Sequence, residues 1–227
     1  MTSSLRRLLP HLDRFNFMIA LFDFDGVVMD TEPQYTAFWD RKGKELFGVE
    51  SFAATIKGQT LVQILERYFP GNEFMQQEIT VMVDELERNM TYEYVPGAFE
   101  FMSSLKAAGI RTAIVTSSNK VKMSQVYKSH PELPDLVDAI LTSEDFARSK
   151  PDPDCFLKGM QLLGGTPETT FVFEDSFHGI AAGRASGAKV VGLATTNKSE
   201  VIAPLCDMVI DDFTGLDYQS LLSSAQM

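Results

Sequence analysis

The residues best suited to chemistry are two carboxylates separated by a single residue, Asp23 and Asp25, which directly follow the apolar run 18–22. An uninterrupted apolar run of this kind indicates a strand that is buried on both faces. Side chains alternate across a strand, so the two aspartates are expected to point to the same side, and Gly26 allows a sharp turn after them. Two negative charges held together at the end of a buried strand are costly unless they share a cation or a proton. From this spacing alone, the alternative is an exposed turn that happens to contain two acids.

Strands and helices alternate from residue 95 to the end of the chain, and this alternation supplies the elements that would position the acids. Such an order predicts a parallel sheet with helices on both faces. In sheets of this kind, ligands bind at the carboxyl ends of the strands. Apart from the first strand, the predicted strands cover residues 112–115, 139–141, 170–173, 189–193 and 208–210.

Polar side chains gather at three of the predicted strand ends, and Lys150 lies on a loop before Pro151. We interpret these groups as one site, because the carboxyl ends of parallel strands meet at one edge of the sheet. Four carboxylates that converge on one crevice call for a hard cation, and oxygen-only ligands favour Mg²⁺ over zinc. None of the three histidines lies near other candidate zinc ligands in the sequence. We interpret His178 as a helix-start residue, with a position at the rim of the site as the alternative. The strand-end groups are Asp23 with Asp25, Thr116 with Ser117, and Glu174 with Asp175.

A cation, a lysine and hydroxyl donors are what phosphoryl transfer requires. The oxygens of the migrating group must be neutralised while the nucleophile and the leaving group are held in line. A carboxylate can then attack phosphorus to give an aspartyl-phosphate, which divides the reaction into two steps. A second carboxylate, if it is kept protonated, can give a proton to the leaving group and later take one from water.

The stretch 34–92 differs from the rest of the chain, because it shows three apolar stripes at helical spacing and no strand pattern. We interpret it as an all-helical unit inserted into the alternating part. The expected organisation is therefore an N-terminal extension over residues 1–17, an α/β core over 18–33 and 93–227, and a helical insertion over 34–92.

The formal charge of −11 and the sequence pI near 4.7 argue against nucleic acid or an anionic membrane as the main partner. No stretch approaches a membrane span, and residues 1–17 lack an apolar run of signal-peptide length. Cys155 and Cys206 form no recognisable disulfide framework, which suits a reducing compartment. We expect a cytoplasmic monomer that meets a small phosphorylated substrate.

In these polar groups and in their order, the sequence resembles the haloacid dehalogenase-like hydrolases over residues 17–212. The resemblance implies a Rossmann-like doubly wound parallel sheet with an inserted all-helical cap that closes over the substrate. The four motifs are Asp23-Phe24-Asp25-Gly26-Val27, Thr116 within 114–117, Lys150-Pro151-Asp152-Pro153, and Glu174-Asp175-Ser176.

The same resemblance implies a role for each motif residue. Asp23 would be the nucleophile and Asp25 the general acid/base. The phosphate would be bound by Thr116, Ser117 and Lys150. Magnesium would be held by Asp23, the backbone carbonyl of Asp25, and Asp175 with Glu174.

Within the family, the chain looks like the β-phosphoglucomutase and sugar-phosphatase branch, because of Asp30-Thr31 and Lys57-Gly58. Two cations that the resemblance leads us to expect in a mutase are missing, since Tyr35 replaces a histidine and Leu61 an arginine. A mutase must hold the second phosphate of a bisphosphorylated intermediate, so a lost cation removes a strong contact. We therefore expect a Mg²⁺-dependent phosphatase of small metabolites such as sugar phosphates, with β-phosphoglucomutase as the alternative. The candidate substrate contacts of the insertion are Tyr35, Lys57 and Gln59.

Two further classes of protein fit these residues less well. A phospho-receiver signalling domain also places acids, a hydroxyl and a lysine around Mg²⁺, but it is smaller and needs no helical insertion. A dehalogenase is disfavoured, because Asp25 has a role in protonating a phosphate leaving group and none in displacing a halide.

Overall fold

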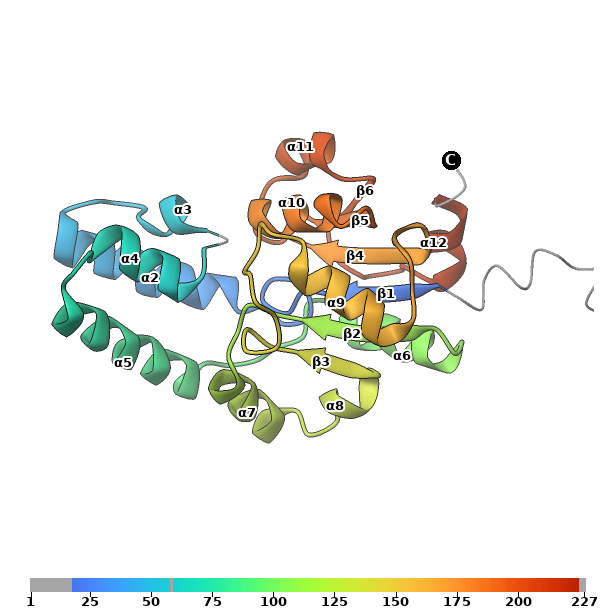
Figure 1. The fold of residues 1–227 in the computed structure, drawn as a ribbon, viewed down its shortest axis with the longest axis horizontal. Helices are drawn as coiled ribbons and strands as arrows, with labels where there is room; N and C mark the ends of the chain where they lie inside the picture. The colour runs from blue at the N-terminus through green and yellow to red at the C-terminus, as the bar shows by residue number, and fades with distance from the viewer. Residues whose placement is uncertain (1–17, 58, 225–227) are drawn as a thin grey trace, which may run out of the picture.

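The computed structural model describes residues 18–57 and 59–224, and its centre is a sheet of six parallel strands in the order β3-β2-β1-β4-β5-β6 (Figure 1). The chain adds strands outward on one side of β1 and then on the other, which places helices on both faces. The predicted doubly wound parallel sheet is confirmed. The expected extension over residues 1–17 lies outside the described residues. The strands are β1 Ile19–Phe22, β2 Arg111–Val115, β3 Ala139–Leu141, β4 Thr170–Glu174, β5 Lys189–Leu193 and β6 Met208–Ile210.

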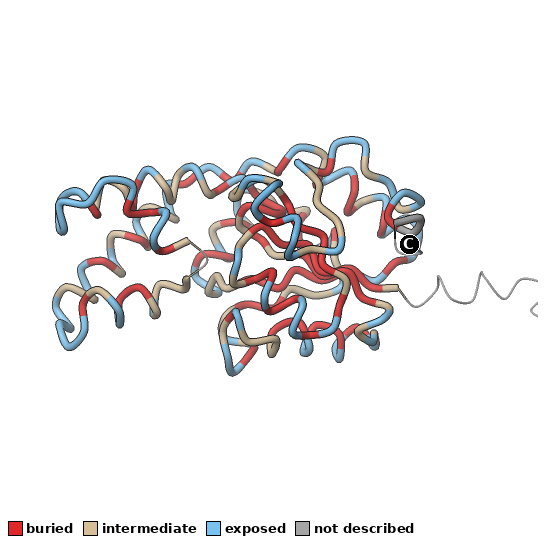
Figure 2. The backbone as a smooth tube through the Cα atoms, turned by 90° about the horizontal axis from the view of Figure 1, so that it is seen from above, coloured by how far each residue is buried: buried red, intermediate tan, exposed pale blue. Residues whose placement is uncertain are grey.

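The central strand β1 is buried on both faces, and its side chains alternate between two hydrophobic cores. Ala20 and Phe22 pack into one core, whereas Ile19 and Leu21 pack into the other. Figure 2 shows the buried residues concentrated along the strands. Burial of a large apolar side chain contributes about 1.5–3 kcal/mol, and a slip of one residue would exchange the two faces. The packing therefore fixes where Asp23 leaves the sheet.

Helices cover both faces of the sheet. Helix α6 packs on β2 from one side, and α9 packs on β1 and β2 from the other. No helix in the described part of the chain is both long and apolar enough to cross a membrane. The core helices are α6 Ala98–Ala107, α7 Lys120–Ser129, α8 Leu133–Leu136, α9 Asp154–Leu163, α10 Phe177–Ala185, α11 Ser199–Ile202 and α12 Tyr218–Ser224, with short 3₁₀ turns at Pro167–Thr169 and Ala203–Leu205.

Four helices form a separate unit beyond the carboxyl ends of the strands (Figure 1). They pack around their own apolar core, which includes Trp39, Phe52 and Ile79. Helix α4 starts with a reciprocal capping box between Thr60 and Gln63, which satisfies two backbone donors. These helices are α2 Glu32–Phe47, α3 Ala53–Ile56, α4 Leu61–Tyr68 and α5 Glu73–Asn89. We refer to this unit as the cap.

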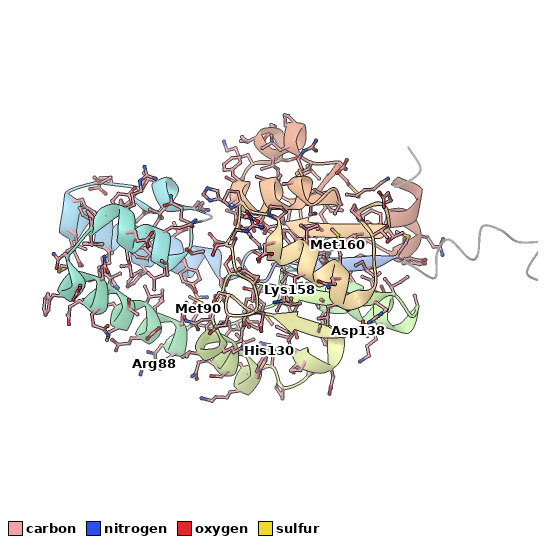
Figure 3. All side chains as sticks on the ribbon, in the orientation of Figure 1. Arg88, Met90, His130, Asp138, Lys158 and Met160 are labelled. Atoms are coloured by element: carbon pink, nitrogen blue, oxygen red, sulfur yellow. The ribbon has the colours of Figure 1, made fainter. Side chains whose placement is uncertain are left out.

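Two chain segments join the cap to the sheet and run side by side. The backbone N–H of Asp30 donates to the Glu93 carbonyl oxygen at 2.8 Å, and that of Val95 donates to the Val28 carbonyl oxygen at 3.0 Å. Just after α5, the Tyr92 carbonyl oxygen lies 2.5 Å from Nε2 of His130, the residue that follows α7. Met90 and His130 are labelled in Figure 3. Helix α5 also packs against the core helix α7.

Candidate active site

A tight turn after β1 brings the first two acids to the edge of the sheet. The Phe24 carbonyl oxygen accepts from the backbone N–H groups of Val28 and Met29, both at 2.9 Å. Gly26 lies in the turn at φ +74°, and a Cβ there would lie 2.2 Å from Asp175 Oδ2. Only glycine allows this backbone to pass so close to the carboxylate. The turn therefore places the first motif directly against the fourth.

One buried ammonium connects the ends of three strands. Lys150 is 4% exposed, and its Nζ donates to Asp23 Oδ1 at 2.7 Å and to Glu174 Oε1 at 2.6 Å. The same Nζ also lies 3.3 Å from the Val115 carbonyl oxygen at the end of β2. Charge-assisted hydrogen bonds of this length are strong. Lys150 therefore ties Asp23 to the last residues of β2 and β4.

Three carboxylates gather at this point. One oxygen from each of Asp23, Glu174 and Asp175 can be chosen so that all lie within 4.8 Å of one another. Burial raises the pKa of Asp23 to about 7 although the charge of Lys150 opposes it. Burial and the charges of Glu174 and Asp23 raise the pKa of Asp175 well above its ordinary value. Like charges and desolvation disfavour the ionised forms, and a hard divalent cation would relieve both. The donor set consists of oxygens alone, which fits Mg²⁺.

Glu174 is the most firmly held of the three. Its Oε2 accepts from the backbone N–H groups of Asp175 and Ser176 and from the Ser176 hydroxyl. Ser176 also caps the start of α10 through the Gly179 N–H. Gly179 leaves the space that Glu174 occupies, since a Cβ there would lie 1.8 Å from the Glu174 carboxyl carbon. Glu174 therefore positions both Lys150 and the fourth motif.

Asp25 has a different set of partners. Lys122 Nζ lies 2.5 and 2.6 Å from its two carboxylate oxygens. The Thr31 hydroxyl donates to Oδ1 at 2.5 Å, and the Ser118 hydroxyl donates to Oδ2 at 2.9 Å. Burial acts to raise the pKa of Asp25, but Lys122 and the two hydroxyls outweigh it and lower the pKa. The four acids were expected to converge, whereas the side chain of Asp25 lies outside the three-carboxylate cluster.

The second motif presents its later residues to the site. Thr116 is 1% exposed, and its hydroxyl oxygen accepts from the Ser118 backbone N–H at 3.0 Å. Its side chain shapes the loop and is absent from the cavity wall formed by the described residues, whereas Ser117, Ser118 and Asn119 line it. The expected phosphate contact of Thr116 remains a prediction, and Ser118 and Asn119 join the candidates.

A cavity of about 660 Å³ lies between the cap and the strand ends. The cavity is lined by the two candidate catalytic acids, Asp23 and Asp25, and also by Lys150 and Asp175. Its volume falls within the range of 300–1,000 Å³ that is typical of small-molecule sites. From the cap, the polar and charged side chains in its wall are Glu32, Tyr35, Thr36, Lys57, Gln59, Thr60, Gln63, Thr80, Asp84 and Glu87.

The three cap residues predicted from the sequence all line this cavity, but each has a partner within the protein. The Tyr35 hydroxyl donates to Glu87 Oε1 at 2.7 Å. Lys57 Nζ donates to the Thr196 carbonyl oxygen at 3.2 Å, which links the cap to the core. The Gln59 amide donates to the Thr55 carbonyl oxygen at 3.1 Å. Their roles toward a substrate remain predictions.

Sequence reasoning missed Lys122. Its position carries a signal, because Lys122, Met123 and Val126 form the buried face of α7. A lysine on an otherwise apolar face requires an anion nearby. His178 was interpreted as a helix-start residue, and it is the second residue of α10.

Comparison with known proteins identifies the class. A family model described as haloacid dehalogenase-like hydrolase matches residues 20–193, and the chain therefore belongs to this family. It is 30% identical over 207 residues to glycerol-1-phosphate phosphohydrolase 2 of Saccharomyces cerevisiae, covering 84% of this chain and 80% of that protein. It is 31% identical over 179 residues to hexitol phosphatase A of Escherichia coli, covering 76% of this chain and 81% of that protein. The solved structure of a putative β-phosphoglucomutase from Bacteroides vulgatus has a TM-score of 0.75 at 22% identity, covering 93% of this chain and 90% of that one.

These matches confirm the family and the assignment of the chain as a phosphatase within it. The alternative of a non-enzymatic receiver domain is thereby excluded. β-Phosphoglucomutase is a related possibility, since relatives of that name are 33% identical to this chain over 141 residues.

Proposed function

We propose that this protein is a Mg²⁺-dependent phosphatase that hydrolyses the phosphate ester of a small polyol or sugar through an aspartyl-phosphate. The observation that carries the proposal is the position of Asp23. It lies 2.7 Å from the Lys150 ammonium, within a cluster of three carboxylates, and it lines the same cavity as Asp25. The names of the yeast and bacterial relatives support a polyol phosphate as the substrate class.

In the first step, an Asp23 oxygen attacks phosphorus and the bond from phosphorus to the substrate oxygen breaks. The Asp25 carboxyl gives its proton to that oxygen, so the product leaves as an alcohol. Lys150 and the Ser117–Asn119 loop would hold the phosphoryl oxygens. A Mg²⁺ ion held by Asp23, Glu174, Asp175 and the Asp25 backbone carbonyl would act as a Lewis acid toward those oxygens.

In the second step, Asp25 takes a proton from water, and the water oxygen attacks phosphorus. The bond from phosphorus to Asp23 breaks, and inorganic phosphate leaves. The four hydrogen bonds on Asp25 favour its ionised form, which suits this step. To act as the proton donor of the first step, Asp25 must exchange at least one of these hydrogen bonds.

The charges in the cavity wall favour hydrolysis over mutase action. Beyond Lys150, which is already shared by two carboxylates, the only Lys or Arg in the wall formed by the described residues is Lys57. Lys57 Nζ lies 3.7 Å from Glu32 Oε2 and donates a hydrogen bond to the Thr196 carbonyl oxygen in the core. Asp84 and Glu87 add negative charge on the same wall. A second phosphate would meet net repulsion there.

A panel of phosphate esters tests the proposal. Glycerol 1-phosphate, sorbitol 6-phosphate, β-glucose 1-phosphate, nucleotides and pyrophosphate are incubated with the protein and Mg²⁺, and phosphate release is measured. We expect hydrolysis of polyol or sugar phosphates that stops on chelation. Conversion of β-glucose 1-phosphate to glucose 6-phosphate without phosphate release would favour the mutase instead.

A further inference from the structure

We propose that Lys122 is a positioning residue that fixes the Asp25 carboxylate in the direction required for proton transfer. This inference rests on the proposed function, in which Asp25 is the general acid/base. Lys122 is on α7 in the core, whereas Asp25 follows β1, so the contact joins residues 97 positions apart. The residue belongs to none of the four motifs that define the site.

The geometry separates Lys122 from the substrate. Its side chain is 1% exposed, and it is not among the described residues that line the cavity. Asp25 is 20% exposed at its side chain and does line the cavity. Lys122 therefore lies behind the cavity wall, and Asp25 is the described wall residue to which it donates hydrogen bonds.

The contact fixes the orientation of Asp25, because Lys122 Nζ binds both oxygens, at 2.5 and 2.6 Å. A single hydrogen bond to one oxygen would leave the carboxylate free to turn about its last bond. The other two donors, Thr31 and Ser118, each bind one oxygen only. Thr31 directly precedes the first cap helix, and Ser118 is in the cavity wall. Lys122 is therefore the donor that holds both oxygens from the core.

The ammonium is itself held by aromatic rings. Lys122 Nζ lies 5.5 Å from the centre of the Phe24 ring and 4.8 Å from the centre of the Tyr35 ring. Ring faces attract a cation, and here they also exclude water from it. Tyr35 in turn donates to Glu87 on α5, so the cap contributes to the placement of Lys122. Asp25 is the one carboxylate with a hydrogen bond to this ammonium among the described residues.

The test compares Lys122→Met with Lys120→Met, which removes an exposed lysine from the same helix. Values of kcat/KM are measured with p-nitrophenyl phosphate, whose leaving group needs no proton, and with whichever of glycerol 1-phosphate and sorbitol 6-phosphate the wild type hydrolyses faster. For Lys122→Met we expect kcat/KM to fall by about 10- to 100-fold with the alkyl phosphate, as is typical of a misplaced catalytic group. With p-nitrophenyl phosphate, and for Lys120→Met with either substrate, we expect less than about a threefold change.

A double variant distinguishes positioning from a general loss of structure. If Lys122 acts through Asp25, then Asp25→Asn with Lys122→Met should match Asp25→Asn alone within about twofold. The proposal is overturned if the fall in kcat/KM of the double variant equals the product of the two single falls. It is also overturned if Lys122→Met lowers kcat/KM equally with both substrates, or does not lower it at all. Lys122→Gln, which keeps a donor, replaces the Met variant if that variant fails to fold, with a smaller loss expected on the alkyl phosphate only. If the wild type hydrolyses no ester, the proposed function is wrong as well. If the enzyme is active but the two single falls in kcat/KM multiply in the double variant, only the role of Lys122 is wrong.

Discussion

The two sides of this site are built from the same pair of residue types, an aspartate and a buried lysine, yet they differ in charge balance. Asp23 shares Lys150 with Glu174, and Asp175 lies beside them. Among the described carboxylates, Asp25 alone accepts hydrogen bonds from Lys122, and it also accepts one from each of two hydroxyl groups. The pKa of Asp23 is raised by burial to about 7, whereas Lys122 outweighs burial and lowers the pKa of Asp25.

This comparison shows that the number of acids per ammonium, rather than burial, separates the two aspartates. Their side chains are similarly enclosed, at 13% and 20% exposure. The Asp23 side has three carboxylates and one lysine, so it is short of positive charge and suited to a divalent cation. On the Asp25 side, one carboxylate pairs directly with one lysine. The following predictions probe this difference in order of decreasing effect.

Asp23→Asn should lower kcat by at least about 10⁴-fold for every ester, because an amide cannot act as the nucleophile. Without metal, the variant should be no less stable than the wild type at pH 8, since one of three like charges is gone. Phosphate release and thermal melting measure the two effects. Residual activity above a few per cent would remove Asp23 from the nucleophile role.

Asp25→Asn should lower kcat/KM for alkyl phosphates by about 10²–10⁴-fold, the usual contribution of a general acid. The loss with p-nitrophenyl phosphate should be much smaller, because nitrophenolate leaves without a proton. Initial rates with both substrates provide the measurement. Equal losses would show that Asp25 does not protonate the leaving group.

Lys150→Met should destabilise the metal-free protein by about 3–5 kcal/mol at pH 8, because it leaves buried carboxylates without their cation. Denaturant unfolding measures the change. Lys128→Met removes an exposed lysine and serves as the control, with almost no effect expected. If both variants unfold at the same denaturant concentration as the wild type, the charge balance described for the Asp23 side is wrong.

Stability without metal should fall as the pH rises from about 4 to 7. Native Asp23 keeps its proton up to a pKa of about 7, whereas the unfolded chain loses it near 3.8, so the native state binds more protons in this window. The raised pKa of Asp175 acts in the same direction. Mg²⁺ at about 100 times its Kd at pH 8 should restore about 2.7 kcal/mol, or roughly 5–10 °C in Tm. The same Mg²⁺ concentration should restore less at pH 5.5, where protons compete with the ion for the carboxylates. A Mg²⁺ shift that is absent, or larger at low pH, would contradict the metal site.

Lys57→Met should have the smallest effect, a rise in KM of about two- to tenfold with kcat nearly unchanged, as expected for one partly exposed contact. The residue links the cap to the core through the Thr196 carbonyl and lines the cavity. Lys44→Met, at an exposed cap position, is the matched control. A large fall in kcat would instead place Lys57 close to the reacting atoms.

The sheet could be predicted from the sequence because each strand is a short apolar run between helical stretches. The runs at 112–115 and 189–193 agree with β2 and β5 to within one residue. Three polar strand ends were enough to locate the site, since sheet topology alone brings them together. The short helix α3 was missed, because four residues do not establish a helical period.

Pairings between distant side chains could not be predicted in the same way. Tyr35 meets Glu87 across the cap, and Lys122 reaches Asp25 across the core. Local periodicity shows which face of a helix is buried, but it does not show what lies opposite that face. The orientation of Thr116 was similarly hidden, since its hydroxyl is taken by the Ser118 N–H of its own loop.

The central claim is that Asp23 forms a covalent bond to the transferred phosphoryl group. Stopping the reaction with acid during turnover and reducing the protein with borohydride converts a phosphoaspartate to homoserine, which mass spectrometry locates in the sequence. Our account predicts homoserine at position 23, in an amount that depends on Mg²⁺. Homoserine at another position, or none in an enzyme that is actively releasing phosphate, would contradict it.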